Sequence, residues 1–340
     1  MEKLLCGVDL GGTKLSAGLV QPDGTLVDCL TTYDHVNKDE DGIINDIAVI
    51  VNDLLEKNNL TEEDLLGMGV VFPGHINGKE GRCITTSNFK AKFKNYPFRD
   101  NIQKYFRKVK ITVDNDANAQ AYAEYKYGAG KNHDDMVFIT VSTGIGAGII
   151  IGGKLIRGMS GTAGEIGHTI IDPDSAIKCT CGNYGCLMTY GGRLLPERAA
   201  EKLRKGVPTN LGINLKNYKT MVTGHSIGRG LDIDDPLAKA VVFECADALG
   251  IALYNLFQLL NPSLVVLGGG LINWGDIYIN RVKETLYSMA GDMMVEKMEI
   301  VTAELAEHAG VLGASALCLE FPDINDKYLE VRNNVGLVKI

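Results

Sequence analysis

Apolar positions near the start of the chain fall into short runs separated by glycine-rich turns. Leu4–Asp9 and Leu15–Val20 are two such runs, and Gly11-Gly12-Thr13-Lys14 lies between them. Apolar runs of this length, bounded by turn residues, predict buried strands. The segment Met136–Ile151 repeats the design around Ser142-Thr143-Gly144-Ile145-Gly146. The repeat of strand, glycine turn and strand predicts a duplicated domain.

Longer segments between and after these two copies alternate between helix and strand patterns. Gly42–Leu55 carries apolar residues at intervals of three and four, which predicts an amphipathic helix. Further expected elements are strands at Leu66–Phe72, Val109–Val113 and Leu264–Leu267 and helices at Ala117–Tyr127, Leu194–Leu203 and Leu237–Leu260. Both glycine turns connect strand to strand, whereas a dinucleotide fingerprint or a P-loop opens a helix. The pattern therefore predicts an α/β protein and disfavours a Rossmann oxidoreductase.

The composition narrows the classes of protein that remain. A chain of 340 residues predicts two domains, and its 45% hydrophobic and 22% charged residues are typical of a globular protein. Lys and Arg number 34 against 42 Asp and Glu, and this formal charge of −8 argues against nucleic-acid binding. The first residues show no signal-peptide pattern, and charged residues interrupt the apolar segment Pro236–Leu260. We expect a cytoplasmic protein that does not contact a membrane.

Three of the eight cysteines are clustered within eight residues, at Cys179, Cys181 and Cys186, with His168 shortly before them. One imidazole and three thiols are the ligand set of a closed tetrahedral zinc site, in which the ion has a structural role. Glycines within the cluster permit the tight turn that such a site needs. The alternative is a set of unligated thiols beside a core histidine. The other cysteines are expected to be reduced, because nothing in the sequence directs the chain to an oxidising compartment.

Each glycine turn has a composition that suits a nucleoside triphosphate. Backbone N–H groups approach phosphates closely where no Cβ intervenes. We expect Asp9 to hold Mg²⁺ or its waters, while Thr13 and the backbone contact phosphate oxygens. The alternative, that both turns are ordinary hairpin connections, stays open.

Two further polar segments are candidates for substrate chemistry. Asp116 lies where an expected strand becomes a helix, and it either caps the helix or accepts a proton from an attacking hydroxyl. Asn115 both donates and accepts hydrogen bonds, which suits a polyol. Glu165 lies three residues before His168. It is either a sugar-binding acid on a loop that the expected zinc ion makes rigid, or a solvated surface acid.

The segment Phe89–Arg99 is both basic and aromatic. Lys90, Lys92 and Lys94 alternate with aromatic residues. Because the whole chain is acidic, we expect a mobile lid or a solvated loop here rather than a polyanion site.

A series of short motifs resembles the ROK family, the bacterial sugar kinases and sugar-responsive repressors of the actin-like ATPase superfamily. The resemblance covers about residues 4–320. It rests on Asp9-Leu10-Gly11-Gly12-Thr13-Lys14, Pro73-Gly74, Ser87-Asn88, Asp114-Asn115-Asp116-Ala117-Asn118, Thr143-Gly144-Ile145-Gly146, Gly164-Glu165-Ile166-Gly167-His168, Cys179-Thr180-Cys181-Gly182-Asn183-Tyr184-Gly185-Cys186, Gly268-Gly269-Gly270 and Gly310-Val311-Leu312-Gly313-Ala314. Such a series is far more specific than any one of its members.

The resemblance implies a fold of duplicated actin-like ATPase (ribonuclease H-like) domains, arranged as two lobes with a central cleft. It implies a small lobe at residues 1–120, to which a helix near 308–322 returns, and a larger lobe at 121–307 that carries the zinc loop. Residues 323–340 then form a polar tail. Members of the family are usually homodimers or larger assemblies, and we expect a homodimer or homotetramer here.

The resemblance also implies an ATP-dependent hexose kinase that transfers the γ-phosphoryl group to a sugar hydroxyl, expected at O6, with Asp116 as general base. The sugar contacts it implies are Gly74, Asn88, Asn115, Asp116, Glu165, His168 and Met188. The contacts to ATP and Mg²⁺ are Asp9, Gly11, Gly12, Thr13, Lys14, Thr143, Gly144, Gly146, Gly268, Gly269 and Gly270. His168, Cys179, Cys181 and Cys186 would hold a structural Zn²⁺.

Two departures from the family pattern bear on the substrate. Met188 stands where the family normally has a glutamate that accepts hydrogen bonds from sugar hydroxyls near C1 and C2. Lys90 and its neighbours replace the Pro-Gly-Trp that often follows Asn88 and its neighbour. An aldohexose such as glucose or mannose remains the first expectation. N-acetylmannosamine or N-acetylglucosamine comes next, because methionine offers an apolar surface to an acetyl group, and a β-glucoside is third.

Two other classes of protein compete with a kinase. A sugar-responsive repressor of this family carries a DNA-binding domain ahead of the first glycine turn, and here eight residues precede Asp9. A catalytically weak sugar-binding protein is the second rival, and the presence of both Asp9 and Asp116 weighs against it. We expect a kinase.

Overall fold

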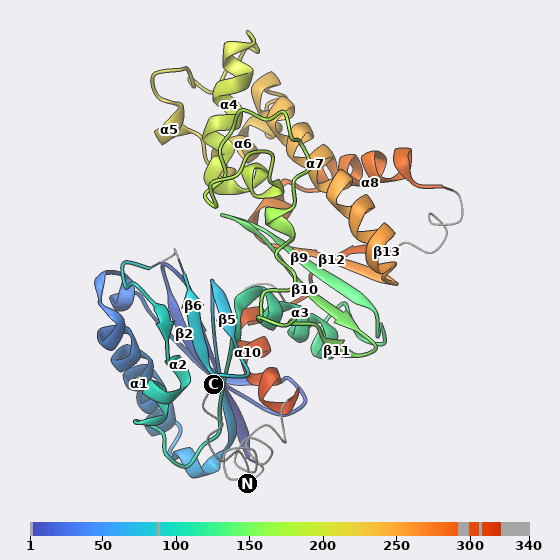
Figure 1. Ribbon diagram of the computed structural model, residues 1–340. Helices are drawn as coiled ribbons and strands as arrows, with labels where there is room; N and C mark the ends of the chain where they lie inside the picture. The colour runs from blue at the N-terminus through green and yellow to red at the C-terminus, as the bar shows by residue number, and fades with distance from the viewer. Residues whose placement is uncertain (1–2, 87–88, 292–298, 306–307, 321–340) are drawn as a thin grey trace, which may run out of the picture. The chain divides into compact units, whose positions relative to one another are not determined.

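The computed structural model describes residues 3–86, 89–291, 299–305 and 308–320. They form two compact units (Figure 1). Unit 1 takes its described residues from 3–131, 157–163 and 308–320, and unit 2 takes its own from 132–156 and 164–305. Each unit is built on a five-stranded mixed sheet.

The sheet of unit 1 has the strand order β3-β2-β1-β4-β8. Its strands are β1 (Leu4–Leu10), β2 (Leu15–Val20), β3 (Leu26–Thr32), β4 (Leu65–Phe72) and β8 (Ile111–Asn115). The first three form an antiparallel meander, while β4 runs parallel to β1 and β8 runs parallel to β4. Successive strands along β1, β4 and β8 therefore end at the same edge of the sheet.

Helices cover both faces of this sheet. Alternate residues of β1 and β4, such as Val8 and Val70, pack in one core with α1 (Glu40–Lys57). The intervening residues include Gly7 and Gly69, which lie against α10 (Ala309–Glu320) so closely that a Cβ on Gly69 would be 1.7 Å from the carbonyl oxygen of Ala314. The helix α3 (Asp116–Tyr127) packs beside α10. The absence of side chains at these glycines lets α10 lie directly on the backbone of the sheet.

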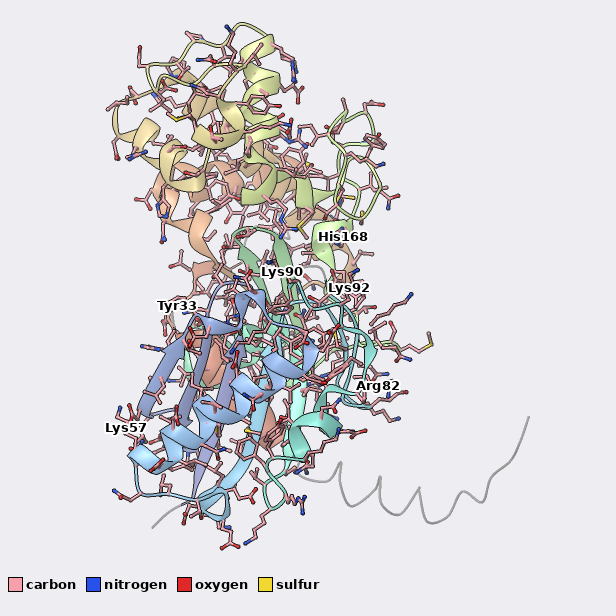
Figure 2. All side chains as sticks on the ribbon, turned by 90° about the vertical axis from the view of Figure 1, so that its left-hand side faces the viewer. Tyr33, Lys57, Arg82, Lys90, Lys92 and His168 are labelled. Carbon is pink, nitrogen blue, oxygen red and sulfur yellow. The ribbon has the colours of Figure 1, made fainter. Side chains whose placement is uncertain are left out.

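A small sheet of β5 (His75–Asn77), β6 (Arg82–Thr85) and β7 (Lys94–Tyr96), followed by α2 (Phe98–Gln103), completes the strands and α-helices described for unit 1. Phe93 and Phe98 are buried here, and Phe98 stacks on Phe72 with ring centroids 4.2 Å apart. The expectation of a solvated loop at Phe89–Arg99 is therefore wrong for these aromatic residues, which the core needs for its apolar surface. The lysines of the segment and Asn95 are exposed as expected, and Figure 2 labels two of these lysines, Lys90 and Lys92.

Unit 2 repeats the plan of unit 1. Its strands are β9 (Met136–Val141), β10 (Ile145–Ile151), β11 (Lys154–Leu155), β12 (Leu264–Gly268) and β13 (Glu299–Thr302). The order β11-β10-β9-β12-β13, with an antiparallel meander followed by two parallel strands, matches unit 1 strand for strand. The prediction of a duplicated domain with an α/β fold is confirmed.

One long helix, α7, organises the core of unit 2. The helices of the unit are α4 (Leu195–Arg204), α5 (Tyr218–Met221), α6 (Gly224–Asp232), α7 (Pro236–Leu260) and α8 (Asp276–Met289). By length and composition α7 is apolar enough to cross a bilayer, but 61% of its most apolar window is buried inside the protein, as for the core helix of a globular domain. It packs against α4, α6 and α8. The prediction of a buried helix at this segment is confirmed.

The division into units falls at different residues from the expected boundary at 120. That position lies inside α3, which stays whole in unit 1 because it packs on α10. Residues 157–163 also belong to unit 1 although their neighbours in sequence belong to unit 2. The helix expected near 308–322 is α10. The polar tail at 323–340 lies outside the described residues.

Candidate active site

The carboxyl ends of three neighbouring strands gather the candidate residues of unit 1. Asp9 is near the end of β1, Gly74 follows β4, and Asn115 ends β8. The strand register pairs Asp9 with Val71 and Phe72 with Asn115. In open α/β sheets, ligands bind outside this edge. The structure therefore brings Asp9, Gly74, Asn115 and Asp116 to one edge of one sheet.

The first glycine turn closes on itself and leaves its tip accessible. The Gly11 N–H donates to the carbonyl oxygen of Lys14 at 2.9 Å, and the side chain of Thr13 is exposed. The carboxyl group of Asp9 lies beside the turn, against Gly310 in the first turn of α10, where a Cβ would be 2.3 Å from Asp9 Oδ2. The glycine at position 310 thus makes room for the carboxylate at a helix N-terminus, whose dipole favours negative charge.

The environment of Asp9 fits a bound cation. Burial raises the pKa of the Asp9 carboxyl, and nearby Lys14 lowers it by a smaller amount. Asp9 is half-buried, and a carboxylate withdrawn from water is costly without a paired charge or a metal ion. The oxygen ligand and its surroundings are therefore compatible with Mg²⁺, which prefers carboxylates and phosphates.

Asn115, rather than Asp116, caps α3. Asn115 Oδ1 accepts hydrogen bonds from Ala117 N at 2.8 Å and Asn118 N at 3.4 Å, and its Nδ2 donates to the carbonyl oxygen of Gly74 at 2.9 Å. The reading of Asp116 as the N-cap is therefore wrong. Asp116 is the first helical residue, is half-buried, and its Oδ1 accepts from Ala117 N at 3.0 Å.

A buried ion-pair network lies behind these residues, and the sequence motifs did not reveal it. Asp114 Oδ1 accepts from Asn115 N at 2.7 Å and from Asn118 Nδ2 at 2.8 Å. Asp114 Oδ2 accepts from Arg157 Nε at 2.6 Å, and the other two guanidinium nitrogens of Arg157 bond Glu320 at 3.2 and 2.5 Å. Burial opposes the charge of Arg157, but the two carboxylates outweigh it and raise the pKa of Arg157. The network ties the start of α3 to α10.

The candidate residues of unit 2 gather at the corresponding edge of its sheet. The turn between β9 and β10 is closed by Ser142 N donating to the carbonyl oxygen of Gly144 at 2.8 Å. The triple glycine that follows β12 packs on the end of β9, since a Cβ on Gly269 would be 2.5 Å from the carbonyl oxygen of Val141. Gly269 has φ +92°, which glycine adopts without strain. Thr143 and Gly144 lie in the first of these two adjacent turns, and Gly269 and Gly270 lie in the second; Thr143, Gly269 and Gly270 are exposed. Gly146 lies in β10 and Gly268 ends β12.

Glu165 and His168 project from a loop that two glycines hold against β10. A Cβ on Gly164 would be 2.3 Å from the carbonyl oxygen of Ala147, and one on Gly167 would be 2.2 Å from that of Ile145. The loop ends in a short 3₁₀ helix in which His168 N donates to the carbonyl oxygen of Glu165 at 3.0 Å. The glycine spacing of this motif is therefore a packing requirement that fixes where the acid and the imidazole emerge.

The histidine and three cysteines meet as the sequence predicts. One ligand atom each from His168, Cys179, Cys181 and Cys186 lie within 4.8 Å of one another. Cys181 Sγ is 3.7 Å from Cys186 Sγ, and Cys179 Sγ is 3.6 Å from His168 Nδ1. Two sulfur ligands about 2.3 Å from a tetrahedral ion would be about 3.7 Å apart. All eight cysteines lie in the described residues and none forms a disulfide, so the donor set is compatible with zinc.

Two of the expected sugar contacts are Met188 and Asn88. Met188 is held against the second glycine turn, where its Sδ accepts from Ile145 N at 3.2 Å and its Cε lies 2.7 Å from the position of a Cβ on Gly167. Asn88 lies outside the described residues.

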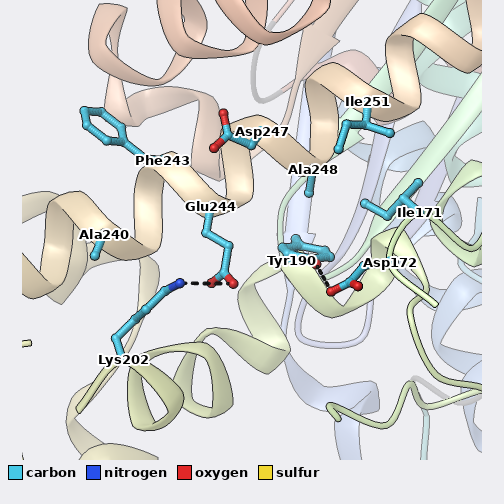
Figure 3. A pocket seen from close by; sticks show the side chains of 10 residues that line it. All are labelled: Ile171, Asp172, Tyr190, Lys202, Ala240, Phe243, Glu244, Asp247, Ala248 and Ile251. Atoms are coloured by element: carbon cyan, nitrogen blue, oxygen red, sulfur yellow. Dashed lines mark hydrogen bonds and ion pairs between the residues drawn. The ribbon is translucent and has the colours of Figure 1, made fainter. Parts of the chain in front are cut away.

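Unit 2 also contains a hollow of about 450 Å³ between α7 and the loop that carries the cysteine cluster (Figure 3). Its polar groups already have partners: Lys202 pairs with Glu244 at 3.2 Å, the Tyr190 hydroxyl donates to Asp172 at 3.2 Å, and Asp247 pairs with Arg281 at 2.7 Å. None of the expected site residues lines it. Size alone therefore does not make it the active site.

Two sheets of identical strand order, each ending a central strand in a glycine turn, define a class: the duplicated ribonuclease H-like domains of the actin-like ATPase superfamily. Comparison with known proteins narrows this class. The model of the ROK family matches residues 5–320, so the chain belongs to the ROK family. The resemblance drawn from the sequence motifs is confirmed.

Three relatives illustrate the similarity. A glucokinase of Thermotoga maritima is 32% identical over 321 residues, which are 94% of this chain and 99% of that protein. The structure of a ROK family glucokinase from Streptomyces griseus, in complex with glucose and AMPPNP, is 30% identical and has a TM-score of 0.75, covering 92% of this chain and 98% of that one. A ROK hexokinase of Thermus thermophilus is 26% identical with a TM-score of 0.76, covering 97% of this chain and 100% of the other.

Proposed function

We propose that this ATP-dependent hexose kinase phosphorylates the 6-hydroxyl of an aldohexose, with Asp116 as general base. The observation that carries the proposal is that two neighbouring residues at the start of α3 have different positions: Asn115 is the N-cap and Asp116 is the first helical residue. Asn115 caps the helix and accepts from both Ala117 N and Asn118 N, so the contact of Asp116 Oδ1 with Ala117 N is not the only one that satisfies this amide. A carboxylate that is half-buried at the carboxyl edge of the sheet is placed where substrates bind in this fold class.

The reaction balances with one proton acceptor. The sugar oxygen forms a bond to the γ-phosphorus as the bond from that phosphorus to the bridging oxygen of ADP breaks. The hydroxyl proton passes to a carboxylate oxygen of Asp116, and ADP leaves. Positioning and charge neutralisation supply most of the rate enhancement in such transfers. Mg²⁺ would neutralise phosphate charge, and Asp9 is the group that would hold it or its waters.

Each unit by itself has a set of proposed nucleotide contacts. From unit 1 these are Asp9, Gly11, Gly12, Thr13 and Lys14. From unit 2 they are Thr143, Gly144, Gly146, Gly268, Gly269 and Gly270. The support for this proposal is that each set lies at the carboxyl edge of its sheet, in turns where the absence of Cβ atoms exposes backbone N–H groups.

The proposed sugar contacts are Gly74, Asn88, Asn115, Asp116, Glu165, His168 and Met188. His168 is proposed to serve both metal and sugar. Its Nδ1 lies toward Cys179, so its Nε2, on the other side of the ring, is the nitrogen left for a sugar hydroxyl.

We also propose that His168, Cys179, Cys181 and Cys186 hold a structural Zn²⁺. The four ligands would complete the coordination and leave no position for substrate. When bound, the ion would fix the loop from His168 to Cys186, and with it the positions of Glu165 and His168. We further propose a cytoplasmic homodimer or homotetramer that acts on small sugars and binds neither nucleic acid nor membrane.

Met188 is the residue that we propose to determine which sugar is preferred. A thioether accepts hydrogen bonds weakly, and in this protein it is already engaged with Ile145 N. We rank glucose or mannose first, in keeping with the relatives, N-acetylmannosamine or N-acetylglucosamine second, and a β-glucoside third.

ADP release from the purified protein with Mg·ATP tests the proposal across glucose, mannose, fructose, N-acetylmannosamine, N-acetylglucosamine and cellobiose, with a sugar-free control. We expect one aldohexose to raise turnover far above the control. The position of the new phosphate is then read from the product by NMR. Turnover that no sugar raises, in protein shown to be folded and to contain zinc, would contradict the proposal, and a product phosphorylated elsewhere than O6 would correct it.

A further inference from the structure

A histidine that belongs to none of the motifs lies against the first glycine turn of unit 1. His35 is in the 3₁₀ helix Asp34–Asn37 that precedes α1, and it is 0% exposed. Its Nε2 is 2.8 Å from the carbonyl oxygen of Gly11. Its ring meets Phe89 edge to face, with centroids 6.5 Å apart. The buried imidazole of His35 therefore contacts the Gly11 carbonyl from the interior of unit 1.

The chemistry of the contact fixes the tautomer. A carbonyl oxygen only accepts hydrogen bonds, so Nε2 carries the hydrogen and donates it to Gly11. The other nitrogen, Nδ1, is buried and has no hydrogen-bond partner among the described residues. A buried polar atom without a partner destabilises a fold. The Nε2 contact with Gly11 is therefore the one hydrogen bond that the imidazole makes among the described residues.

The hydrogen bond sets the direction of a peptide plane. Gly11 C=O and Gly12 N–H belong to the same planar trans peptide group, so they point in opposite directions. Because the carbonyl is drawn inward to His35, the Gly12 N–H is turned away from the core. No described residue accepts a hydrogen bond from this amide. Glycine on both sides of the peptide would otherwise let the plane rotate at low cost.

We propose that His35 is a positioning residue for the nucleotide: its Nε2–H holds the Gly11–Gly12 peptide so that the Gly12 amide faces a phosphate oxygen of ATP. This inference rests on the proposed role of the Gly11–Lys14 turn in binding the nucleotide. It assigns a task to a residue outside that turn, 24 positions along the chain from Gly11. The amide is oriented before ATP arrives, so binding does not have to order it.

The test compares two substitutions that differ in one hydrogen-bond donor. His35→Gln places an amide N–H within reach of Gly11, whereas His35→Leu fills the space without a donor. We expect His35→Leu to raise the KM for ATP, and the Kd for Mg·ADP measured by calorimetry, about fivefold to tenfold. The kcat and the KM for sugar should stay within about twofold, and His35→Gln should keep both nucleotide constants within about twofold of the wild type. His35→Met is the second donor-free variant if the leucine protein does not fold.

Two controls separate this inference from its alternatives. Ile47→Ala removes buried apolar volume from α1 and lowers the melting temperature without touching the turn, so its KM for ATP should not change. Asp9→Asn tests the nucleotide assignment itself. A normal KM for ATP in His35→Leu, or equal damage in the glutamine and leucine proteins, overturns the role of His35. Unchanged nucleotide constants in Asp9→Asn would instead overturn the assignment of the turn to ATP.

Discussion

Replacing Arg157 with methionine should weaken both the stability of unit 1 and the reaction. The substitution keeps most of the buried aliphatic volume but removes the guanidinium from between two carboxylates, whose side chains are 3% exposed at Asp114 and 16% exposed at Glu320. Removing one partner of a buried ion pair costs about 3–5 kcal/mol, because the other charge is left uncompensated. Water reaches part of Glu320, so we expect about 3 kcal/mol. For a domain of this size that loss lowers the melting temperature by about 6–12 °C.

Arg157→Met should also lower the activity, because Arg157 holds Asp114 in place next to the candidate site. This carboxylate holds the Asn115 N–H and the Asn118 side chain at the start of α3. Without Arg157 it is free to reorient, and we expect kcat to fall about tenfold at a temperature where both proteins are folded. Differential scanning calorimetry gives the stability, and coupled ADP release gives kcat.

Arg281 provides a matched control for this experiment. It makes a similar two-nitrogen contact with Asp247, but its side chain is 40% exposed. Arg281→Met should therefore cost less than about 1 kcal/mol. Equal losses of stability in the two variants, or a normal melting temperature in Arg157→Met, would refute the reasoning that burial gives the network its strength.

Two further predictions concern the cysteine cluster and Met188. Cys181→Ser should lower both the zinc content, measured by atomic absorption, and the melting temperature, because metal binding contributes to the folding free energy of the loop. Cys29→Ser, outside the cluster, should change neither quantity. Unchanged zinc content in Cys181→Ser would remove that thiol from the ligand set. Met188→Glu should restore a strong hydrogen-bond acceptor worth about 1.5–3 kcal/mol and shift the ratio of kcat/KM for glucose over N-acetylmannosamine upward by about 10–150-fold. An unchanged ratio would show that this position does not select the sugar.

The pattern of hydrophobic and polar residues predicted the strands and helices that contain long apolar runs, and it missed those that do not. The strands Leu15–Val20 and Met136–Val141 have the expected bounds, because glycine turns limit them on at least one side. The turn expected at Ser142–Gly146 placed the start of the next strand at Ala147. β10 begins two residues earlier, at Ile145, since Ile145 and Gly146 already pair with Val141 and Thr140. β3 was not expected, because this edge strand is only partly buried and shows no apolar run.

The sequence also revealed only those parts of the candidate site whose residues are close together in the chain. The cluster of His168 and the cysteines could be predicted because its members are close in sequence. Arg157 and His35 could not be found, since their partners Asp114 and Gly11 are 43 and 24 residues away. Only the folded chain brings such pairs together. Asp116 was recognised from its position between strand and helix, but the hydrogen bonds of Asn115 were needed to show that Asn115, and not Asp116, caps α3.

The role of Asp116 as general base is the central claim, and Asp116→Asn tests it most directly. Asparagine has nearly the same shape and keeps the start of α3, but it cannot take up the hydroxyl proton. The measurement is kcat for phosphorylation of the best sugar, with the KM for ATP, the KM for the sugar and the melting temperature as companions. We predict a fall in kcat of about 10²–10⁴-fold, with the KM values within a few-fold and the melting temperature unchanged. A kcat close to that of the wild type would contradict the account.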